Sequence, residues 1–331
     1  MNLKFNQILA VTVAFILFYP FKINAQSADY AAEVLTKGAG ARPLAMGGAF
    51  AAAANDATAA YWNPAGLALV QDIEITTMHS IQNDIQSYDF INLALNTQSA
   101  GSYSLSYMRL GSDGIPYTTT SPTVLGTLSY EDQAALISGG WKIGKQFAVG
   151  GTIKLLKTDI SGSGGGFSTV SAVGFGSDLG AIYKPIKELS IGLVARDYTG
   201  GSYIQWSNST TSPTQVLQPS ATLGLSWTEE LGNREMVNNV LTPVSTLSVN
   251  LDFDSLYITK GLNNYHFGVE YWYKQFVAVR AGFETKGFQF DGDDFIPSAG
   301  VGVWAYLFEI DYAFVNSPIG AIHYLSLITR L

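Results

Sequence analysis

Apolar side chains alternate with polar or small ones, residue by residue, along most of the chain from Asp72 to Leu331. In residues 91–96, for example, Ile, Leu and Leu alternate with Asn, Ala and Asn. Each alternating segment holds about nine to eleven residues, the length that a tilted strand needs to cross a lipid bilayer. Fourteen such segments follow one another, an even number, as a closed bacterial barrel requires.

Two fold classes fit this alternation: a soluble all-β protein and a membrane β-barrel. After residue 25 no segment approaches the roughly 18 uninterrupted apolar residues of a spanning helix, so helical membrane spans are excluded. The chain has no cysteine, so disulfides cannot stabilise the fold. A closed barrel is stabilised by complete strand pairing and leaves no strand edge exposed, and the sequence therefore favours a membrane barrel.

The connections between the predicted strands alternate in length. The long ones are predicted at residues 111–129, 161–172 and 198–218, and they are rich in Gly, Ser and Thr. In bacterial barrels such loops face outward and the short turns face the periplasm. Residues 228–242 break this rule, and they are interpreted as an insertion or as a loop that contacts a partner.

Aromatic residues gather near the predicted strand ends. Trp141, Trp272 and Trp304 each lie within a few residues of a predicted turn. Aromatic rings at these positions are typical of the girdles that mark the two membrane interfaces of a barrel. These residues are therefore interpreted as part of an interfacial girdle, with amphipathic rings at headgroup depth.

The first 25 residues have the composition of a secretory signal. Lys4 precedes an apolar run from Ile8 to Tyr19, and Ile23-Asn24-Ala25 suits cleavage after Ala25. The sequence thus predicts three parts: a signal peptide at residues 1–25, an N-terminal segment at 26–70, which the family resemblance described below implies is a plug or hatch, and the barrel at 71–331. The predicted location is the outer membrane of a Gram-negative bacterium.

The stretch from Gly38 to Leu69 differs from the rest because it is packed with Ala and Gly. Small residues allow a backbone to press closely against a surrounding wall. Asn63-Pro64 is a helix start, since Asn can cap free amides and Pro at the first helical position loses no hydrogen bond. From the residues alone, this stretch is interpreted as a surface helix pair ahead of the barrel.

Charged residues at positions of inward parity form the second group of candidate site residues. Those selected as lumen charges are Lys154, Arg196, Asp252, Glu270, Arg280, Glu309, Asp311 and Arg330. Their mixed signs indicate ion pairs among strands and to the plug, with Arg42 as a candidate partner of a wall carboxylate. A network that only satisfies buried charge is favoured over a substrate pathway.

No catalytic constellation is present in the sequence. His79, His266 and His323 lie on different predicted strands without the spacing of a metal site, and each is interpreted as an interfacial or lumen residue. The chain also lacks a nucleophile elbow and a phosphate loop. We therefore expect no cofactor, no metal and no enzymatic activity, and the formal charge of −8 argues against nucleic acid as a partner.

The Ala- and Gly-rich stretch also carries a family resemblance. It reads G-A-x-A-R-x-L-x-M-G-G-A, then N-D-A, then Y-W-N-P-A-G-L. This order resembles the N-terminal signature of the PorV/PorQ outer-membrane proteins, which are related to the FadL transporters. The residues taken from it as the plug motif are Gly38, Arg42, Met46, Gly47, Gly48, Asn55, Asp56, Trp62, Asn63, Pro64, Ala65 and Gly66.

The resemblance implies an all-β fold: a 14-stranded antiparallel transmembrane β-barrel of the FadL type with a small N-terminal helical plug. It also implies a non-enzymatic role in type IX secretion, in which the protein binds or shuttles secreted cargo proteins. The alternative is a FadL-like passive channel for hydrophobic small molecules. Expected partners are outer-membrane lipid and, depending on the role, cargo and other secretion components or a hydrophobic ligand.

Overall fold

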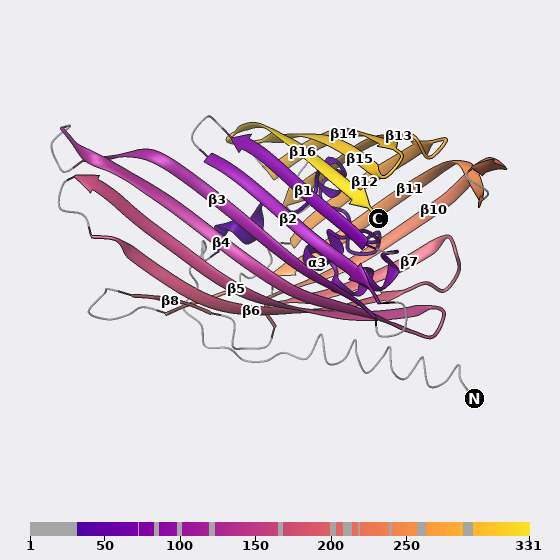
Figure 1. Ribbon diagram of the computed structural model, residues 1–331, viewed down its shortest axis with the longest axis horizontal. Helices are drawn as coiled ribbons and strands as arrows, with labels where there is room; N and C mark the ends of the chain where they lie inside the picture. The colour runs from indigo at the N-terminus through magenta and orange to yellow at the C-terminus, as the bar shows by residue number, and fades with distance from the viewer. Residues whose placement is uncertain are drawn as a thin grey trace.

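A computed structural model describes most of the chain beyond residue 31 (Figure 1). The described residues are 32–71, 73–82, 86–97, 101–118, 123–164, 168–198, 203–207, 214–217, 219–237, 240–256, 263–286 and 294–331. The predicted signal peptide lies outside the described residues, and its cleavage remains a prediction.

The described strands form one antiparallel sheet that closes on itself. Its fourteen barrel strands confirm the predicted fold class. They are β1 (Ile73–Gln82), β2 (Gln86–Asn96), β3 (Ser102–Thr118), β4 (Val124–Ile143), β5 (Phe147–Gly164), β6 (Val170–Tyr183), β7 (Leu189–Arg196), β10 (Ser220–Val237), β11 (Val240–Leu256), β12 (Asn263–Tyr273), β13 (Val277–Lys286), β14 (Phe295–Ala305), β15 (Phe308–Ser317) and β16 (Gly320–Arg330). Two further strands, β8 (Tyr203–Trp206) and β9 (Thr214–Val216), form a side hairpin on β6.

The barrel closes where the first strand meets the last. Strand β1 pairs with β16 in one unbroken register, from Glu74 opposite Arg330 to Ile81 opposite His323. The pairing of β1 with β2 and of β2 with β3 is equally continuous. Because each barrel strand has a neighbour on both sides, its backbone N–H and C=O groups are satisfied within the protein.

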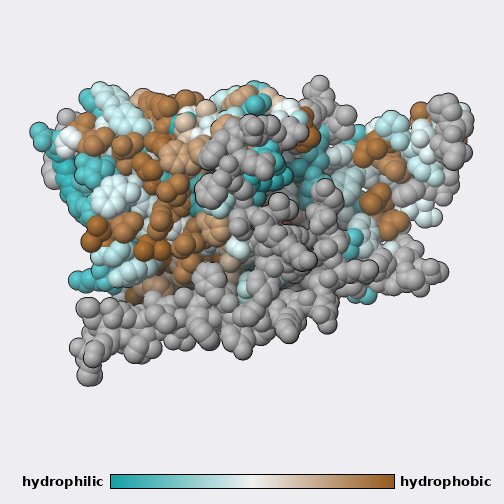
Figure 2. Space-filling model, turned by 180° about the vertical axis from the view of Figure 1, so that it is seen from behind, coloured by the Kyte–Doolittle hydropathy of each residue, from teal (hydrophilic) through white to brown (hydrophobic). Residues whose placement is uncertain are grey.

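The outer face of the barrel carries a broad apolar band. Large hydrophobic side chains such as Leu105, Leu225, Val279 and Ile310 are exposed there, and Figure 2 shows hydrophobic side chains gathered across the wall. A face this apolar needs a nonpolar environment, which a bilayer supplies. Among the described residues, no helix is both long enough and apolar enough to cross a membrane.

The strands continue into several stretches that the sequence analysis assigned to loops. Strand β3 runs to Thr118 and β4 begins at Val124, so most of the predicted loop 111–129 is paired. The predicted connection 228–242 is likewise the end of the β10–β11 hairpin, with a register shift between Leu231 and Arg234. These predictions were wrong because apolar alternation reports only contact with lipid, whereas strand pairing continues where both faces meet water.

These extensions make the barrel uneven. We name the two ends by their connections: the short-turn end carries the turns 144–146, 184–188 and 274–276, and the loop end is opposite. In Figure 1, β3, β4, β5 and β6 reach farther to the left, at the loop end, than β1 and β2 do. Part of the barrel rim therefore stands above the rest as a sheet of β3 to β6.

Two of the three tryptophans assigned to an interfacial girdle face the lumen instead. The guanidinium carbon of Arg280 lies 5.3 Å from the centroid of the Trp272 ring. The guanidinium carbon of Arg330 lies 3.9 Å from the centroid of the Trp304 ring. Only Trp141 points outward, where it packs edge-on against Tyr103. Strand parity decides the face, and position near a turn does not, because successive side chains point to opposite sides.

The N-terminal segment lies inside the barrel. Its helices are short: η1 (Glu33–Thr36), α2 (Ala41–Ala45), α3 (Ala59–Trp62) and η2 (Pro64–Leu69). Asn63 caps the last of them, because its side-chain oxygen accepts a hydrogen bond from the Ala65 amide and Pro64 occupies the first turn. Nearly all the Ala and Gly residues of this segment are buried inside the barrel, so we refer to residues 32–70 as the plug.

A set of wall glycines lets the plug backbone approach the strands. At each one, an added Cβ would overlap plug atoms. Their cross-strand pairing places Gly140 opposite Gly150, Gly150 opposite Gly180, Gly192 opposite Gly224, and Gly268 opposite Gly282. We call these seven residues and Gly300, which meets Ala45, the glycine belt. Glycine inside a strand commonly marks such a close backbone approach.

We predict that Gly150→Val displaces the plug, because the Cβ of residue 150 would overlap the backbone of Pro64 and Ala65. Overpacking at a site of this kind costs about 1–3 kcal/mol. The neighbouring Gly151 faces outward, where a Cβ would lie 3.6 Å from the Asp178 carbonyl oxygen in ordinary contact, so Gly151→Val is the matched control. Urea unfolding in micelles and limited proteolysis of residues 38–70 measure the difference. Equal protease resistance in the two variants would contradict the role of the belt.

Candidate functional site

Arg42 ties the plug to the wall. Its Nε and Nη2 atoms each lie 2.8 Å from an oxygen of Glu270 on β12, and its Nη1 lies 2.9 Å from Asp56 and 2.7 Å from Asn55, both in the plug. The fork of the guanidinium matches a carboxylate in two parallel bonds, which fixes direction as well as distance. One side chain therefore organises both the plug fold and its position in the lumen.

Electrostatic attraction outweighs desolvation at this residue. Burial alone would lower the pKa of the Arg42 guanidinium, but Glu270 and Asp56 raise it well above the ordinary value. The guanidinium carbon also lies 5.1 Å from the ring centroid of Phe50. Arg42 is therefore charged at any physiological pH.

The ion pairs continue around the inner wall. Arg280 on β13 donates to Glu270 at 2.7 Å, to Glu309 at 3.3 Å and to Asp311. Arg330 on β16 then bridges Glu309 at 3.0 Å and Glu74 at 2.7 Å.

This chain of charges returns to the plug, because the second oxygen of Glu74 accepts a 2.8 Å hydrogen bond from the Ala57 amide. The network thus begins at Asp56 and ends at Ala57, so both of its ends lie in the plug. Buried charges are costly unless they are paired in this way.

A second group of hydrogen bonds holds the backbone between Ala45 and Ala51. One oxygen of Asp252 on β11 accepts from the amides of Phe50 at 2.7 Å and Ala51 at 2.6 Å. The Nδ1 atom of His266 on β12 lies 2.7 Å from the Gly47 carbonyl oxygen. Ser298 on β14 accepts from the Gly47 amide and donates to the Ala45 carbonyl.

Gly47 and Gly48 are both needed for this path. Their φ angles are 63° and 81°, a left-handed conformation that other residues rarely adopt. A Cβ on Gly47 would also overlap the backbone of Phe283. The Gly-Gly pair of the motif is therefore a requirement of both the turn and the contact.

The other plug-motif residues shape the plug itself. Gly38 has φ 78°, and its carbonyl accepts from the Tyr88 hydroxyl. The indole of Trp62 donates to Ala39 at 2.7 Å. Met46 is fully buried beside Asn250, and Gly66 lies so close to Ala54 that a Cβ would overlap its carbonyl. These contacts explain the residue types at these motif positions through packing and hydrogen bonds of the plug. None of these contacts involves a ligand.

The predicted lumen charges all lie on the inner face, but the structure divides them into separate groups. Glu270, Arg280, Glu309, Asp311 and Arg330 belong to the network around Arg42. Arg196 donates to the Trp62 carbonyl at 3.1 Å and to Thr222, so it holds the plug from β7.

Lys154 forms a further group on the same inner face. Its Nζ lies 2.8 Å from Asp178 and 2.7 Å from Asp197. Asp197 follows directly after β7, with φ 53°, and its amide donates to Asp178. This group therefore fixes the end of β7 against β5 and β6, and serves the wall more than the plug.

The three histidines also separate. His266 faces the lumen, whereas His79 and His323 lie on the outer face. Among the described residues, no group of three or more His, Asp or Glu side chains is arranged to hold a metal ion.

Two cavities lie on opposite sides of the plug. The outer cavity, toward the loop end, has a volume of about 310 Å³ and is lined by Leu35, Leu44, Trp62, Ile296 and Val315 together with polar groups from β7, β11, β12 and β13. The inner cavity, about 210 Å³, opens among the turns of the short-turn end and is lined mainly by polar side chains. Burial and the neighbouring Lys142 lower the pKa of Lys184 at its mouth.

The lumen wall is apolar on one side, which the sequence analysis missed. Inward side chains of β1 to β5 form a cluster with Val34 of η1; the wall members include Met78, Phe90, Met108, Leu136 and Leu156. The signal was present in the sequence, because these segments carry large apolar residues at inward as well as outward parity. The inward glycines of the belt were similarly readable as points of close backbone approach.

Comparisons with known proteins support the fold. No protein-family profile matches the sequence, and no curated protein is significantly similar to it. Solved structures do match. The Ralstonia pickettii toluene transporter TbuX is 14% identical with a TM-score of 0.59, over 89% of this chain and 99% of TbuX. The Pseudomonas putida toluene transporter TodX is 12% identical with a TM-score of 0.57, over 93% of this chain and 98% of TodX.

A Pseudomonas aeruginosa FadL homologue is 12% identical with a TM-score of 0.51, over 85% of this chain and 95% of that protein. The chain therefore has the FadL-type barrel fold along nearly its whole described length. None of these comparisons supports the PorV/PorQ resemblance in particular.

We predict that Arg42→Met lowers the free energy of unfolding by about 3–5 kcal/mol, because it leaves Asp56 buried without its cation and Glu270 with Arg280 alone. Arg42→Lys restores the charge without the fork and should fall between Arg42→Met and the wild type. Arg234, whose ion pair with Glu230 is exposed, is the control, and Arg234→Met should cost about 0–1 kcal/mol. Urea unfolding in micelles gives these values. Similar losses for Arg42→Met and Arg234→Met would refute the anchoring role of Arg42.

Proposed function

We propose that this protein is an outer-membrane channel that lets small hydrophobic molecules pass by diffusion through a plugged barrel. The observation that carries the proposal is the pair of cavities, one on each side of a thin part of the plug. Gly48 lines the outer cavity and Ala52 lines the inner one, so residues 49–51 are the barrier between them. Proteins with the same fold include toluene transporters, which supports a ligand of this class.

The outer cavity suits a small ligand. Its volume lies at the lower end of the range for small-molecule sites, about 300–1,000 Å³. Its apolar side chains come from the plug and from β14 and β15, and the facing wall is polar, with Arg196, Asp254 and Glu284 among its groups. A ligand pocket combines apolar contact area with polar groups that fix the orientation of the ligand, and here the apolar part is the side formed by the plug, β14 and β15.

The barrier between the cavities and the residues beside it are held by hydrogen bonds to the wall and within the plug, among them those of Ser298 to Gly47 and of Asn63 to Ala51. The Phe50 and Ala51 amides share one oxygen of Asp252, and the Gly47 carbonyl meets His266. Each barrel strand is paired with a neighbour on both sides, so the proposed route runs along the plug and not sideways through the wall. Passage then requires that residues 47–51 move away from β11 and β12.

The proposed location follows from the same features. The apolar outer wall is placed in the outer membrane, with the loop end outside and the short turns in the periplasm. The proposed parts are a signal peptide at 1–25, the plug segment at 26–70 and the barrel at 71–331. The chain acts in this proposal as a passive pore without enzymatic activity.

A second candidate is the role in type IX secretion that the PorV/PorQ resemblance implies. The observation that favours it is the raised sheet at the loop end, where Ile115, Val124 and Leu125 are exposed beyond the apolar band. A closed wall and apolar outer segments suit the recognition of a protein better than the passage of a ligand. Under this candidate the raised sheet of β3 to β6 contacts exported cargo.

We predict that the protein accelerates uptake of radiolabelled toluene by Gram-negative cells that carry it in their outer membrane. Val315→Trp and Ile296→Trp fill the outer cavity and should reduce that uptake several-fold, whereas Val303→Trp on the outer face should not. Heat-modifiability on gels checks that each variant is folded. Uptake equal to that of cells without the protein would refute the channel.

Affinity capture from cross-linked outer membranes separates the two candidates. Recovery of secreted proteins that share a C-terminal domain, lost when Ile115 and Val124 are changed to Ser, is expected only for the secretion role. Capture of no such proteins, together with toluene uptake that Val315→Trp reduces several-fold, is expected only for the channel.

A further inference from the structure

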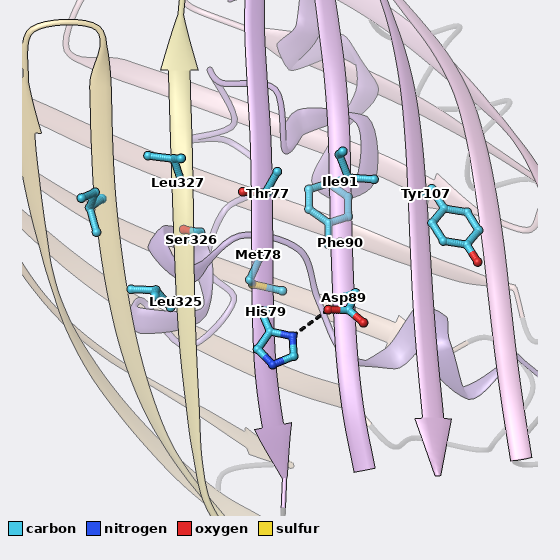
Figure 3. Close-up of a pocket in the computed structure, with 11 residues that line it drawn as sticks. Thr77, Met78, His79, Asp89, Phe90, Ile91, Tyr107, Leu325, Ser326 and Leu327 are labelled. Carbon is cyan, nitrogen blue, oxygen red and sulfur yellow. Dashed lines mark hydrogen bonds and ion pairs between the residues drawn. The ribbon is translucent and has the colours of Figure 1, made fainter. Parts of the chain in front are cut away.

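The outer wall of the barrel contains a groove that the lumen does not explain. It lies over β1 and its neighbours β16, β2 and β3, and has a volume of about 530 Å³ (Figure 3). Its lining is almost entirely apolar, with Leu325 and Leu327 on one flank and Ile91 and Tyr107 on the other. The volume of the groove exceeds the volumes of the two cavities beside the plug.

The groove exists because one outward side chain is small. Thr77 on β1 stands directly between Leu327 on β16 and Ile91 on β2, its two partners in the strand register. Both flanking residues project farther from the wall than a threonine does. The register thus produces a depression about one side chain wide across β1 at Thr77, open toward the surroundings of the barrel.

A row of charged side chains borders the groove on the loop-end side. His79 Nδ1 lies 2.6 Å from Asp89, and Arg109 Nε lies 3.0 Å from Glu131. The row continues to Lys157 on β5, which pairs with Asp159 at 2.6 Å. All of these side chains are on the outer face.

Charges on the outer face of a barrel are expensive within the hydrocarbon and inexpensive at its surface. The charged row therefore lies at the headgroup level of the loop-end leaflet. The groove begins at His79 and Asp89 and continues from there into the apolar band.

We propose that the groove binds one lipid of this leaflet, with an acyl chain lying over Thr77 and a polar headgroup at His79, Asp89 and Arg109. The groove offers a contact for each part of such a lipid. An apolar trough lies at hydrocarbon depth for the acyl chain, and hydrogen-bonding groups lie at headgroup depth for the headgroup. The proposal rests on the membrane location of the barrel and does not depend on transport.

Two other occupants fit the wall less well. A transported ligand would need a passage from the lumen, and the pairing of β16, β1, β2 and β3 is unbroken along the groove. A second copy of the chain would need a projecting ridge that enters a trough one side chain wide. A flexible acyl chain meets neither obstacle.

The test is lipid retention measured by native mass spectrometry. The full-length protein is reconstituted in vesicles of phosphatidylethanolamine and phosphatidylglycerol, extracted in mild detergent, and scored for bound phospholipid. We expect one retained lipid per chain in the wild type. Thr77→Trp fills the groove and should reduce retention about ten-fold. Val301→Trp, an equally exposed change on β14, is the control and should leave retention unchanged.

The contact with the lipid headgroup is tested by the double variant Arg109→Gln with His79→Ala. This variant should weaken lipid retention, although the contact of the acyl chain with the groove remains. Equal retention in Thr77→Trp and wild type overturns the proposal, as does absence of any bound lipid from the wild type. A wild-type dimer that Thr77→Trp dissociates would assign the groove to a second copy. Loss of toluene uptake in Thr77→Trp would assign it to the ligand route, whereas unchanged uptake with lost lipid supports the lipid site even if the channel proposal fails.

Discussion

Every backbone N–H and C=O group inside a bilayer must find its partner within the protein. In this chain the requirement is met when β1 pairs with β16, and the rest of the structure follows from that closure. Fourteen strands enclose a lumen that side chains alone do not fill, so the first part of the chain folds into it. Because that plug must contact the strands at backbone distance, the wall carries glycine at positions such as Gly150 and Gly282.

The lumen also decides how charge is used. A barrel interior tolerates polar groups, but once the plug fills it those groups are removed from water and must pair with one another. Arg42 is central because it belongs to the plug and yet binds Glu270 of the wall. The network that extends through Arg280 and Arg330 back to Ala57 makes the position of the plug a property of the whole inner face.

The same arrangement leaves one thin part of the plug. Between the two cavities the plug is only a few residues thick, and its backbone there is held by hydrogen bonds to Asp252, His266 and Ser298 of the wall and to Asn63 of the plug. The strong ionic anchor at Arg42 lies beside this segment and not within it. A plug whose ionic anchor lies outside its thinnest segment can open a path when that segment moves alone, which is what the channel proposal requires.

The sequence alone determined the fold class, because the period of two and the length of its segments leave few alternatives for a chain without spanning helices. It also identified the plug stretch and the inward charges, since parity assigns a face to each strand residue. Parity was not applied to Trp272 and Trp304, and apolar alternation could not follow strands beyond the lipid. Only the tertiary structure decided which charges meet, where two cavities remain, and that Thr77 lies at the bottom of a groove, because these depend on register between segments far apart in the chain.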